Sequence, residues 1–173
     1  KLREKDNYFL GPIARYNLNF DKLSPIVKQV ASDLNLPRQI NNPFKSIIVR
    51  GLETLYACDE AIRIIDQYEK PDEPSIQINP IEATGNGASE APRGMLYHRY
   101  RINEEGLIMD AKIVPPTSQN QKTIEKDLKY FIPPRVNLPE KELVLQCEQA
   151  VRNYDPCISC ATHFLKLHVE REN

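Results

Sequence analysis

The segment DPCISCATH (residues 155–163) constrains the chemistry of this chain more than any other part of the sequence. It places the thiols of Cys157 and Cys160 three residues apart and the imidazole of His163 three residues later. Pro is tolerated in a first helical turn, so the segment predicts a turn at Pro156 into a short helix. Residues at this spacing stay roughly on one helix face, so both sulfurs are expected to point toward one metal ion.

A thiolate pair suits nickel, iron, copper(I) or zinc as the bound metal. The spacing by itself leaves three alternatives open, namely metal ligation, a redox dithiol and two buried thiols. The sequence holds two further cysteines, Cys58 and Cys147, and neither has a partner at ligand spacing. Each is therefore predicted to pack inside a helix as a small apolar residue.

Composition narrows the class of protein. The chain has 173 residues, of which 40% are hydrophobic, and a formal net charge of −1. This length is enough for one ordinary domain. No basic block stands out, so we expect no nucleic-acid partner. We also expect no membrane span, because no long apolar run is present. The N-terminus lacks the apolar region of a secretory signal, which favours reduced thiols in the cytoplasm.

The fold is predicted to be α+β, mainly helical with a small β-hairpin region. A Ser-Pro start at residues 24–25 and an Asn-Pro start at residues 42–43 each predict a helix. The predicted elements are a loop over 8–20, a helix from 25 to Pro37, the longest helix over 44–68, a loop over 69–81, a hairpin over 95–114, a helix capped by Ser118 that runs to about 130, and a last helix over 139–153. Gly85 and Gly87 are expected to allow an unusual backbone path.

Three further segments precede DPCISCATH and also carry recognisable motifs. In chain order they are LGPIARYN (10–17), GNGASEAPRG (85–94) and IVPPTSQN (113–120). Together the four segments resemble the large (alpha) subunit of nickel–iron hydrogenases, closest to cytoplasmic hydrogenases coupled to soluble electron carriers. The resemblance covers most of the chain. It implies an enzyme that cleaves dihydrogen reversibly and heterolytically to protons and electrons.

The resemblance also implies a set of metal ligands. Cys157 would be a terminal nickel ligand and proton acceptor, and Cys160 would bridge nickel and an iron that carries cyanide and carbonyl ligands. His163 would bind a separate metal, magnesium or iron.

Other site residues follow from the same resemblance. Arg93 would lie over the open coordination position, with Asp155 orienting it. Glu90 would either support Arg93 or simply be solvated. Thr117 would donate a hydrogen bond to a cyanide, and Pro116 would line the pocket around the diatomic ligands. The alternatives are a surface arginine in a turn for Arg93 and a helix N-cap for Asp155.

One departure from the family pattern is large, because the N-terminal C-x2-C pair of the family is absent from these 173 residues. We therefore expect residues 1–173 to be the C-terminal portion of a larger subunit, inactive when alone. Expected partners are the N-terminal half of that subunit, a maturation endopeptidase that cleaves after His163, and an iron–sulfur small subunit. Residues 164–173 would then be a cleavable extension, and apolar surface would be exposed where the other half packs.

Two rival functions remain open at this level. The chain could be a non-catalytic module that binds zinc through Cys157 and Cys160. It could also be a complex-assembly module on the same scaffold, with vestigial thiols.

Overall fold

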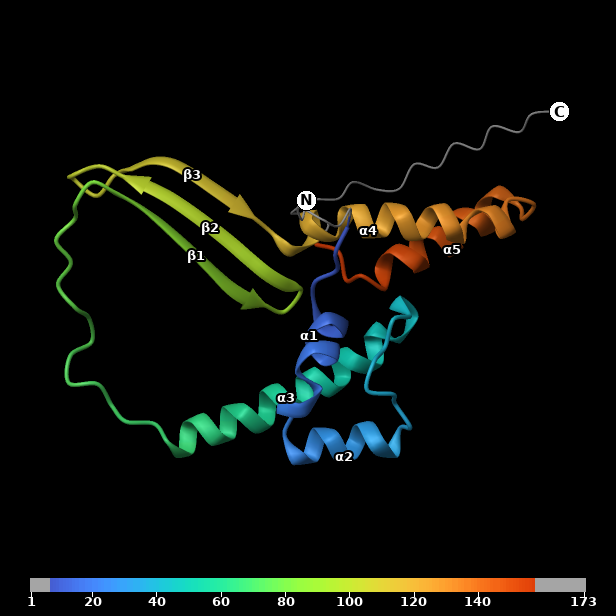
Figure 1. The fold of residues 1–173 in the computed structure, drawn as a ribbon, viewed down its shortest axis with the longest axis horizontal. Helices are drawn as coiled ribbons and strands as arrows, with labels where there is room; N and C mark the ends of the chain where they lie inside the picture. Colours follow the sequence, from blue (N-terminus) through green and yellow to red (C-terminus); the bar gives the residue numbers. More distant parts are fainter. Residues whose placement is uncertain (1–6, 158–173) are drawn as a thin grey trace.

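The computed structural model describes residues 7–157. These residues form five α-helices and three strands, so the predicted α+β class is confirmed. Figure 1 shows the first three helices in one group, the last two side by side, and the sheet beside both groups. The elements are α1 (Pro12–Asn19), α2 (Pro25–Asp33), α3 (Ser46–Asp66), β1 (Ala83–Ala91), β2 (Gly94–Ile102), β3 (Ile108–Val114), α4 (Pro116–Phe131) and α5 (Glu140–Arg152), with short 3-10 turns at Phe20–Lys22, Pro43–Lys45 and Pro133–Arg135.

The main core lies between α1, α2 and α3. Its buried side chains are Ile13, Tyr16, Val27, Ala31, Ile40, Val49 and Leu52. Burial of such aliphatic side chains stabilises the fold by roughly 1.5–3 kcal/mol each. The phenol of Tyr16 donates to the carbonyl of Pro37, which ties the end of the α2 loop to α1.

A second contact joins the two helical groups. The hydroxyl of Ser46, at the start of α3, donates to the carbonyl of Asn153 just after α5. The rings of Phe44 and Phe131 stack with their centroids 6.0 Å apart. These contacts fix the end of α5, and with it Asp155, relative to α3.

The sheet is antiparallel in the order β1-β2-β3, and β1 and β2 are joined by a tight turn in which Ala91 pairs with Gly94. The predicted hairpin is therefore correct for β2 and β3 but incomplete. Gly85 and Gly87 lie in a regular strand, opposite Tyr100 and His98, rather than on an unusual backbone path. Pairing with β2 supplies the hydrogen bonds of β1, and the β1 sequence lacks the apolar alternation that would have revealed a strand.

Three other local predictions were wrong. The segment predicted as a loop at 8–20 contains α1, which begins at Pro12 because Pro fits a first helical turn. Helix α4 begins at Pro116, and Ser118 does not cap it but donates to the carbonyl of Pro115. Cys58 is exposed because the later turns of α3 extend away from the core.

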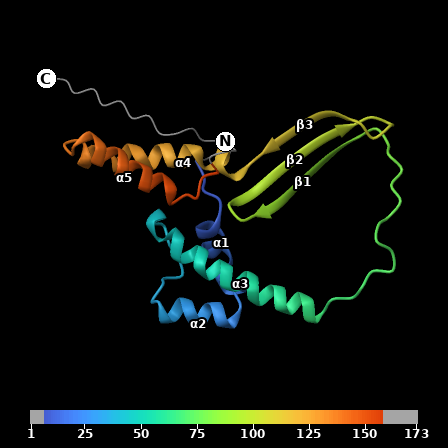
Figure 2. The ribbon, with the colours of Figure 1, turned by 180° about the vertical axis from the view of Figure 1, so that it is seen from behind.

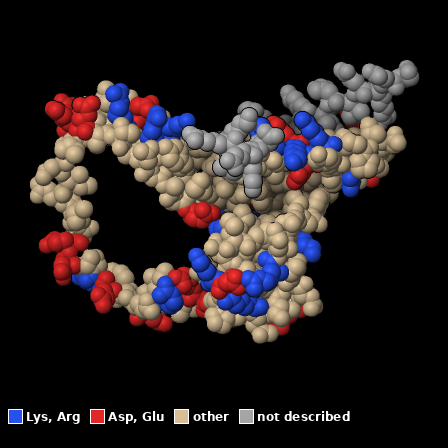
Figure 3. All heavy atoms as spheres, viewed as in Figure 1, with Lys and Arg blue, Asp and Glu red and all other residues tan. Residues whose placement is uncertain are grey.

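Many large apolar side chains are exposed among the described residues. Several of them lie on α3, on the 67–82 segment and on β3, and the largest include Ile62, Ile65, Ile76, Ile78 and Ile108. Figure 3 shows a wide opening bounded by the sheet, the 67–82 segment and α3. Figure 2 shows the same arrangement from behind. Among the described residues, no helix is both long and apolar enough to cross a membrane.

Candidate metal centre

Three segments that are far apart in the sequence meet near the end of the described chain. They are the β1–β2 turn with Arg93, the start of α4 with Pro116 and Thr117, and the segment after α5 with Asp155 and Cys157. The sequence predicted these five residues as one site. The structure brings them together, while Cys160 and His163 lie outside the described residues.

Arg93 contacts Asp155 in two ways. Its Nε donates to the Asp155 carbonyl at 2.9 Å and lies 3.3 Å from the carboxylate Oδ2. The side chains are 44% and 36% exposed, so water screens the pair and it adds at most about 1 kcal/mol to stability. The contact therefore matters more for the direction of the Arg93 side chain than for stability.

A second arginine binds the same carboxylate. Nη1 of Arg50, on α3, lies 3.3 Å from Oδ1 of Asp155. Asp155 itself has a φ of 49°, a left-handed conformation that Asp and Asn adopt more easily than most residues. The carboxylate is thus held between a helix and the β1–β2 turn.

Cys157 is placed by its backbone. Its amide donates to the Thr117 hydroxyl oxygen at 3.1 Å. Thr117 is 6% exposed, and the neighbouring Pro116 is buried at the first turn of α4. Because the Thr117 oxygen accepts this bond, its hydroxyl hydrogen is left to donate elsewhere in the site.

Glu90 differs from the prediction. Its carboxylate pairs with Arg15 at 2.5 Å, instead of with Arg93. Arg15 also forms a forked pair with Glu53 and donates to two carbonyls of the β1–β2 turn. Burial acts to lower the pKa of Arg15, but hydrogen bonds and charge from Glu53 and Glu90 raise it overall. The guanidinium is therefore firmly charged.

Sequence reasoning missed Arg15, Glu53 and Arg50 as members of this network. The partners lie 38 to 105 residues apart in the sequence (Arg15 to Glu53, Arg50 to Asp155), and no local pattern relates them. The one available signal was the position of Arg15 inside LGPIARYN, a segment already singled out by the resemblance.

The other two cysteines of the described residues, Cys58 and Cys147, lie within helices α3 and α5. Cys147 is 1% exposed on α5, as predicted, and burial raises the pKa of its thiol, which keeps it protonated. Cys58 is exposed on α3. Neither has the environment of a metal ligand.

The donor set around Cys157 fits one part of a thiolate metal site. Among the described residues, no group of three or more His, Cys, Asp or Glu side chains could hold a metal ion alone. Cys157 is half-buried and offers one soft sulfur, its amide bonds to the Thr117 hydroxyl, and the guanidinium of Arg93 contacts Asp155 two residues earlier. The arrangement thus suits a thiolate-ligated metal that carries anionic ligands.

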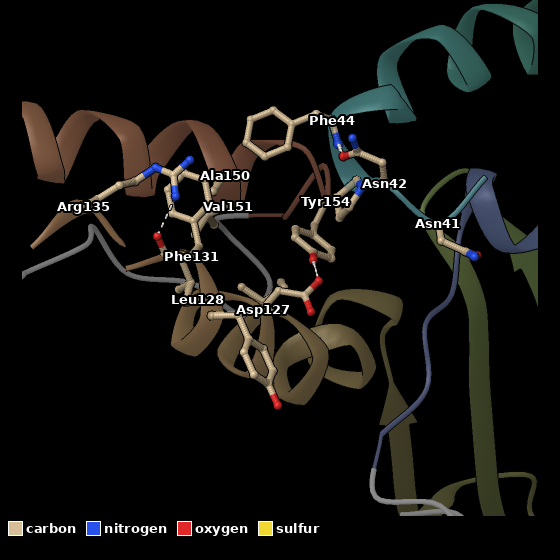
Figure 4. Close-up of a pocket in the computed structure, with 13 residues that line it drawn as sticks. Asn41, Asn42, Phe44, Asp127, Leu128, Phe131, Arg135, Ala150, Val151 and Tyr154 are labelled. Atoms are coloured by element: carbon tan, nitrogen blue, oxygen red, sulfur yellow. Dashed lines mark hydrogen bonds between the residues drawn. The ribbon is translucent and has the colours of Figure 1, made fainter. Parts of the chain in front are cut away.

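A pocket of about 430 Å³ lies between α4, α5 and residues 41–44. Figure 4 shows the Tyr154 phenol directed at the carboxylate of Asp127, with which it forms a short hydrogen bond. The pair ties α4 to the residue that precedes Asp155. Tyr154 and Asp127 line this pocket, whereas Arg93, Thr117 and Cys157 do not.

The family model described as nickel-dependent hydrogenase matches residues 5–163 of this chain. The alpha subunit of sulfhydrogenase 1 from Pyrococcus furiosus is 29% identical over 162 residues, which cover 92% of this chain and 38% of that protein. The beta subunit of the NAD-reducing hydrogenase HoxS from Cupriavidus necator is 28% identical over 173 residues, covering 94% of this chain and 35% of that protein.

Solved structures agree with these sequence matches. An NAD+-reducing NiFe hydrogenase in the H2-reduced state superposes with a TM-score of 0.68 and 27% identity, over 94% of this chain and 37% of that chain. The chain spans little more than a third of the length of the relatives it matches.

Proposed function

Because this chain belongs to the nickel-dependent hydrogenase family, we propose that it supplies the C-terminal part of the catalytic large subunit of a nickel–iron hydrogenase. The observation that carries this proposal is that the segment 155–157 contacts both Arg93, through Asp155, and Thr117, through the Cys157 amide. The proposed substrate is dihydrogen, which is cleaved to two protons and two electrons. A cytoplasmic location belongs to the same proposal.

Cys157 and Cys160 would hold the metals, with two more thiolates from polypeptide outside these 173 residues. The sequence contains no other C-x2-C pair that could supply them. When bound, the nickel and iron, with cyanide and carbonyl on the iron, supply the coordination and electron transfer for heterolytic cleavage. His163 would bind a separate magnesium or iron ion.

The residues of this chain perform the remaining tasks. The positively charged guanidinium of Arg93 is held by Asp155, so it can polarise dihydrogen or donate to an anionic ligand. The Thr117 hydroxyl would donate to a cyanide, and its oxygen accepts a hydrogen bond from the Cys157 amide. Pro116, buried at the start of α4, would give the diatomic ligands an apolar neighbour. The sulfur of Cys157 takes one proton from the substrate and passes it on.

The proposed partners follow from the same assignment. An iron–sulfur small subunit would carry electrons away, and the missing half of the large subunit would cover the exposed apolar side chains of α3 and the sheet. A maturation endopeptidase would cut after His163, which makes residues 164–173 an extension removed after nickel insertion.

Elemental analysis tests the proposal. The chain is co-expressed with the rest of the large subunit, the maturation machinery and the small subunit, and we measure nickel and iron in the purified complex. About one nickel per complex, with iron and hydrogen uptake that Cys157→Ala abolishes, is the expected result. Zinc alone would support a non-catalytic metal-binding module, and no metal would support an assembly module.

A further inference from the structure

We infer that Arg15 is a positioning residue, which holds the turn before Arg93 so that the Arg93 guanidinium reaches Asp155. The inference rests on the proposed function, since it assigns Arg15 a task through Arg93. Arg15 lies on α1, outside the segments that meet at the site, and only 20% of its side chain is exposed.

Arg15 binds the three residues that directly precede Arg93. Its Nη1 lies 2.5 Å from the Glu90 carboxylate and donates to the Ala91 carbonyl at 2.9 Å. Its Nη2 donates to the Pro92 carbonyl at 2.6 Å. One guanidinium thus fixes the backbone on the side of the turn from which Arg93 leaves.

Helix α3 fixes the guanidinium in turn. The Glu53 carboxylate accepts from Nε at 2.5 Å and from Nη2 at 2.7 Å, a forked geometry that sets the plane of the group. Arg50, three residues earlier on the same helix, contacts Asp155. Helix α3 therefore positions both partners of the Arg93–Asp155 contact: Asp155 directly through Arg50, and the turn before Arg93 through Glu53 and Arg15.

Close backbone packing makes this placement stiff. A Cβ added to Gly11 would lie 2.9 Å from the Arg93 carbonyl oxygen, and one added to Gly94 would lie 2.7 Å from the Cβ of Leu10. The φ angles of these glycines are 109° and 132°. The start of α1 and the turn thus touch backbone to backbone, and Arg15 completes the contact one helical turn later.

A structural role alone would also explain a stabilising arginine, so the test uses the coupling to Arg93. In the complete, metal-loaded hydrogenase we compare Arg15→Gln, Arg93→Lys and the double variant. Arg99→Gln is the matched control, because Arg99 forms an ion pair with Asp110 on the exposed part of the sheet. Nickel and iron content, kcat, KM for dihydrogen and the infrared bands of the cyanides are measured for each.

We expect Arg15→Gln to keep its nickel and iron and its KM, to lower kcat by roughly tenfold to a hundredfold, and to shift the cyanide bands in the same direction as Arg93→Lys. The double variant should be no slower than Arg93→Lys alone, because residues that act through one another are not additive. Independent, multiplying losses, or unchanged kcat and bands in Arg15→Gln, would overturn the inference.

Amide hydrogen exchange on the 173-residue chain separates this inference from the proposed function. Arg15→Gln should speed exchange at the amides of Arg93 and Gly94 by about tenfold, and Arg99→Gln should not. A wild-type complex without nickel and iron would defeat the proposed function. The exchange result would still decide whether Arg15 holds the turn, and equal rates in the two variants would refute it.

Discussion

The backbone amide of Cys157 donates a hydrogen bond to the side-chain oxygen of Thr117 over 3.1 Å, and so joins segments 40 residues apart. Thr117 is rigidly placed in the first turn of α4, with 6% of its surface exposed. The position of the first cysteine of the C-x2-C pair is thus set by a helix that ends 26 residues before it. The position of the Cys157 backbone therefore depends on how α4 packs.

Removing the Thr117 hydroxyl should loosen this junction. Thr117→Val keeps the shape of the side chain but leaves the Cys157 amide without this acceptor. Cys157 is only half-buried, so water can replace the lost acceptor in part. We therefore expect the free energy of unfolding to fall by about 1 kcal/mol, the low end of the cost of an unsatisfied buried donor. Urea denaturation of the full chain measures it.

Thr54→Val is the matched control for this substitution. Thr54 is exposed on α3 and its hydroxyl donates only to the Arg50 carbonyl within the same helix. Thr54→Val should change the free energy of unfolding by no more than about 0.5 kcal/mol. Equal effects of the two substitutions would show that the bond to Cys157 does not stabilise the chain.

Replacement by alanine should have opposite effects on stability at two glycines, Gly11 and Gly51. Gly11→Ala places a Cβ against the Arg93 carbonyl at a φ of 109°, so we expect destabilisation by about 1–3 kcal/mol. Gly51 lies within α3 with open space around it, and Gly51→Ala should stabilise by about 0.5–1 kcal/mol. Midpoints of urea unfolding check both, and a Gly11→Ala variant as stable as the wild type would contradict the close approach of α1 to the turn.

Much of this architecture was predictable from the sequence. The α+β class, the long helix from Ser46 and the last helix into residue 152 have local signals, namely Pro at helix starts and apolar spacing. The family was identified from four short segments, and this recognition is confirmed. Ligand roles for Cys160 and His163 stay predictions.

Other features have no local signal. Strand β1 lacks alternation, and it is a strand because β2 pairs with it. Glu90 was predicted to support Arg93 but pairs with Arg15. Its partner depends on which arginine lies next to the folded turn, and residue spacing does not reveal that. Cys58 is exposed because half of α3 has no covering element among the described residues. In each case a long-range contact, present or missing, decided the outcome.

Two substitutions at Asp155 separate the effect of its left-handed backbone on stability from the effect of its charge. Asp155→Asn removes the ion pairs with Arg50 and Arg93 but keeps a residue type that tolerates a φ of 49°. Asp155→Ala removes the charge and adds a left-handed cost, so it should be less stable than the Asn variant by about 1 kcal/mol. Differential scanning calorimetry of the full chain measures the difference.

The control pair lies at Asp21, which is 77% exposed and pairs with Arg38. Asp21→Asn and Asp21→Ala should differ by less than about 0.5 kcal/mol. If the Asp155 pair differs no more than the Asp21 pair, the left-handed backbone at Asp155 is not a source of strain.

Tyr154 predicts how stability depends on alkaline pH. Burial, then the hydrogen bond to Asp127 and its charge, raise the pKa of the Tyr154 phenol above its ordinary value. In the unfolded chain the phenol loses its proton near pH of about 10, whereas the folded state keeps it. The unfolded state then binds fewer protons, so the stability that Tyr154 contributes is present below this pH and is lost as pH rises above it.

Urea unfolding of the full chain at a series of alkaline pH values tests this linkage. Tyr154→Phe should be less stable near neutral pH, because Asp127 loses its donor, but its stability should fall less steeply above about pH 10. Some slope should persist, because burial also raises the pKa of Tyr16. Tyr68→Phe, at a site 69% exposed, should keep the wild-type slope. Parallel curves for wild type and Tyr154→Phe would mean that the Tyr154–Asp127 contact does not hold the segment before Asp155.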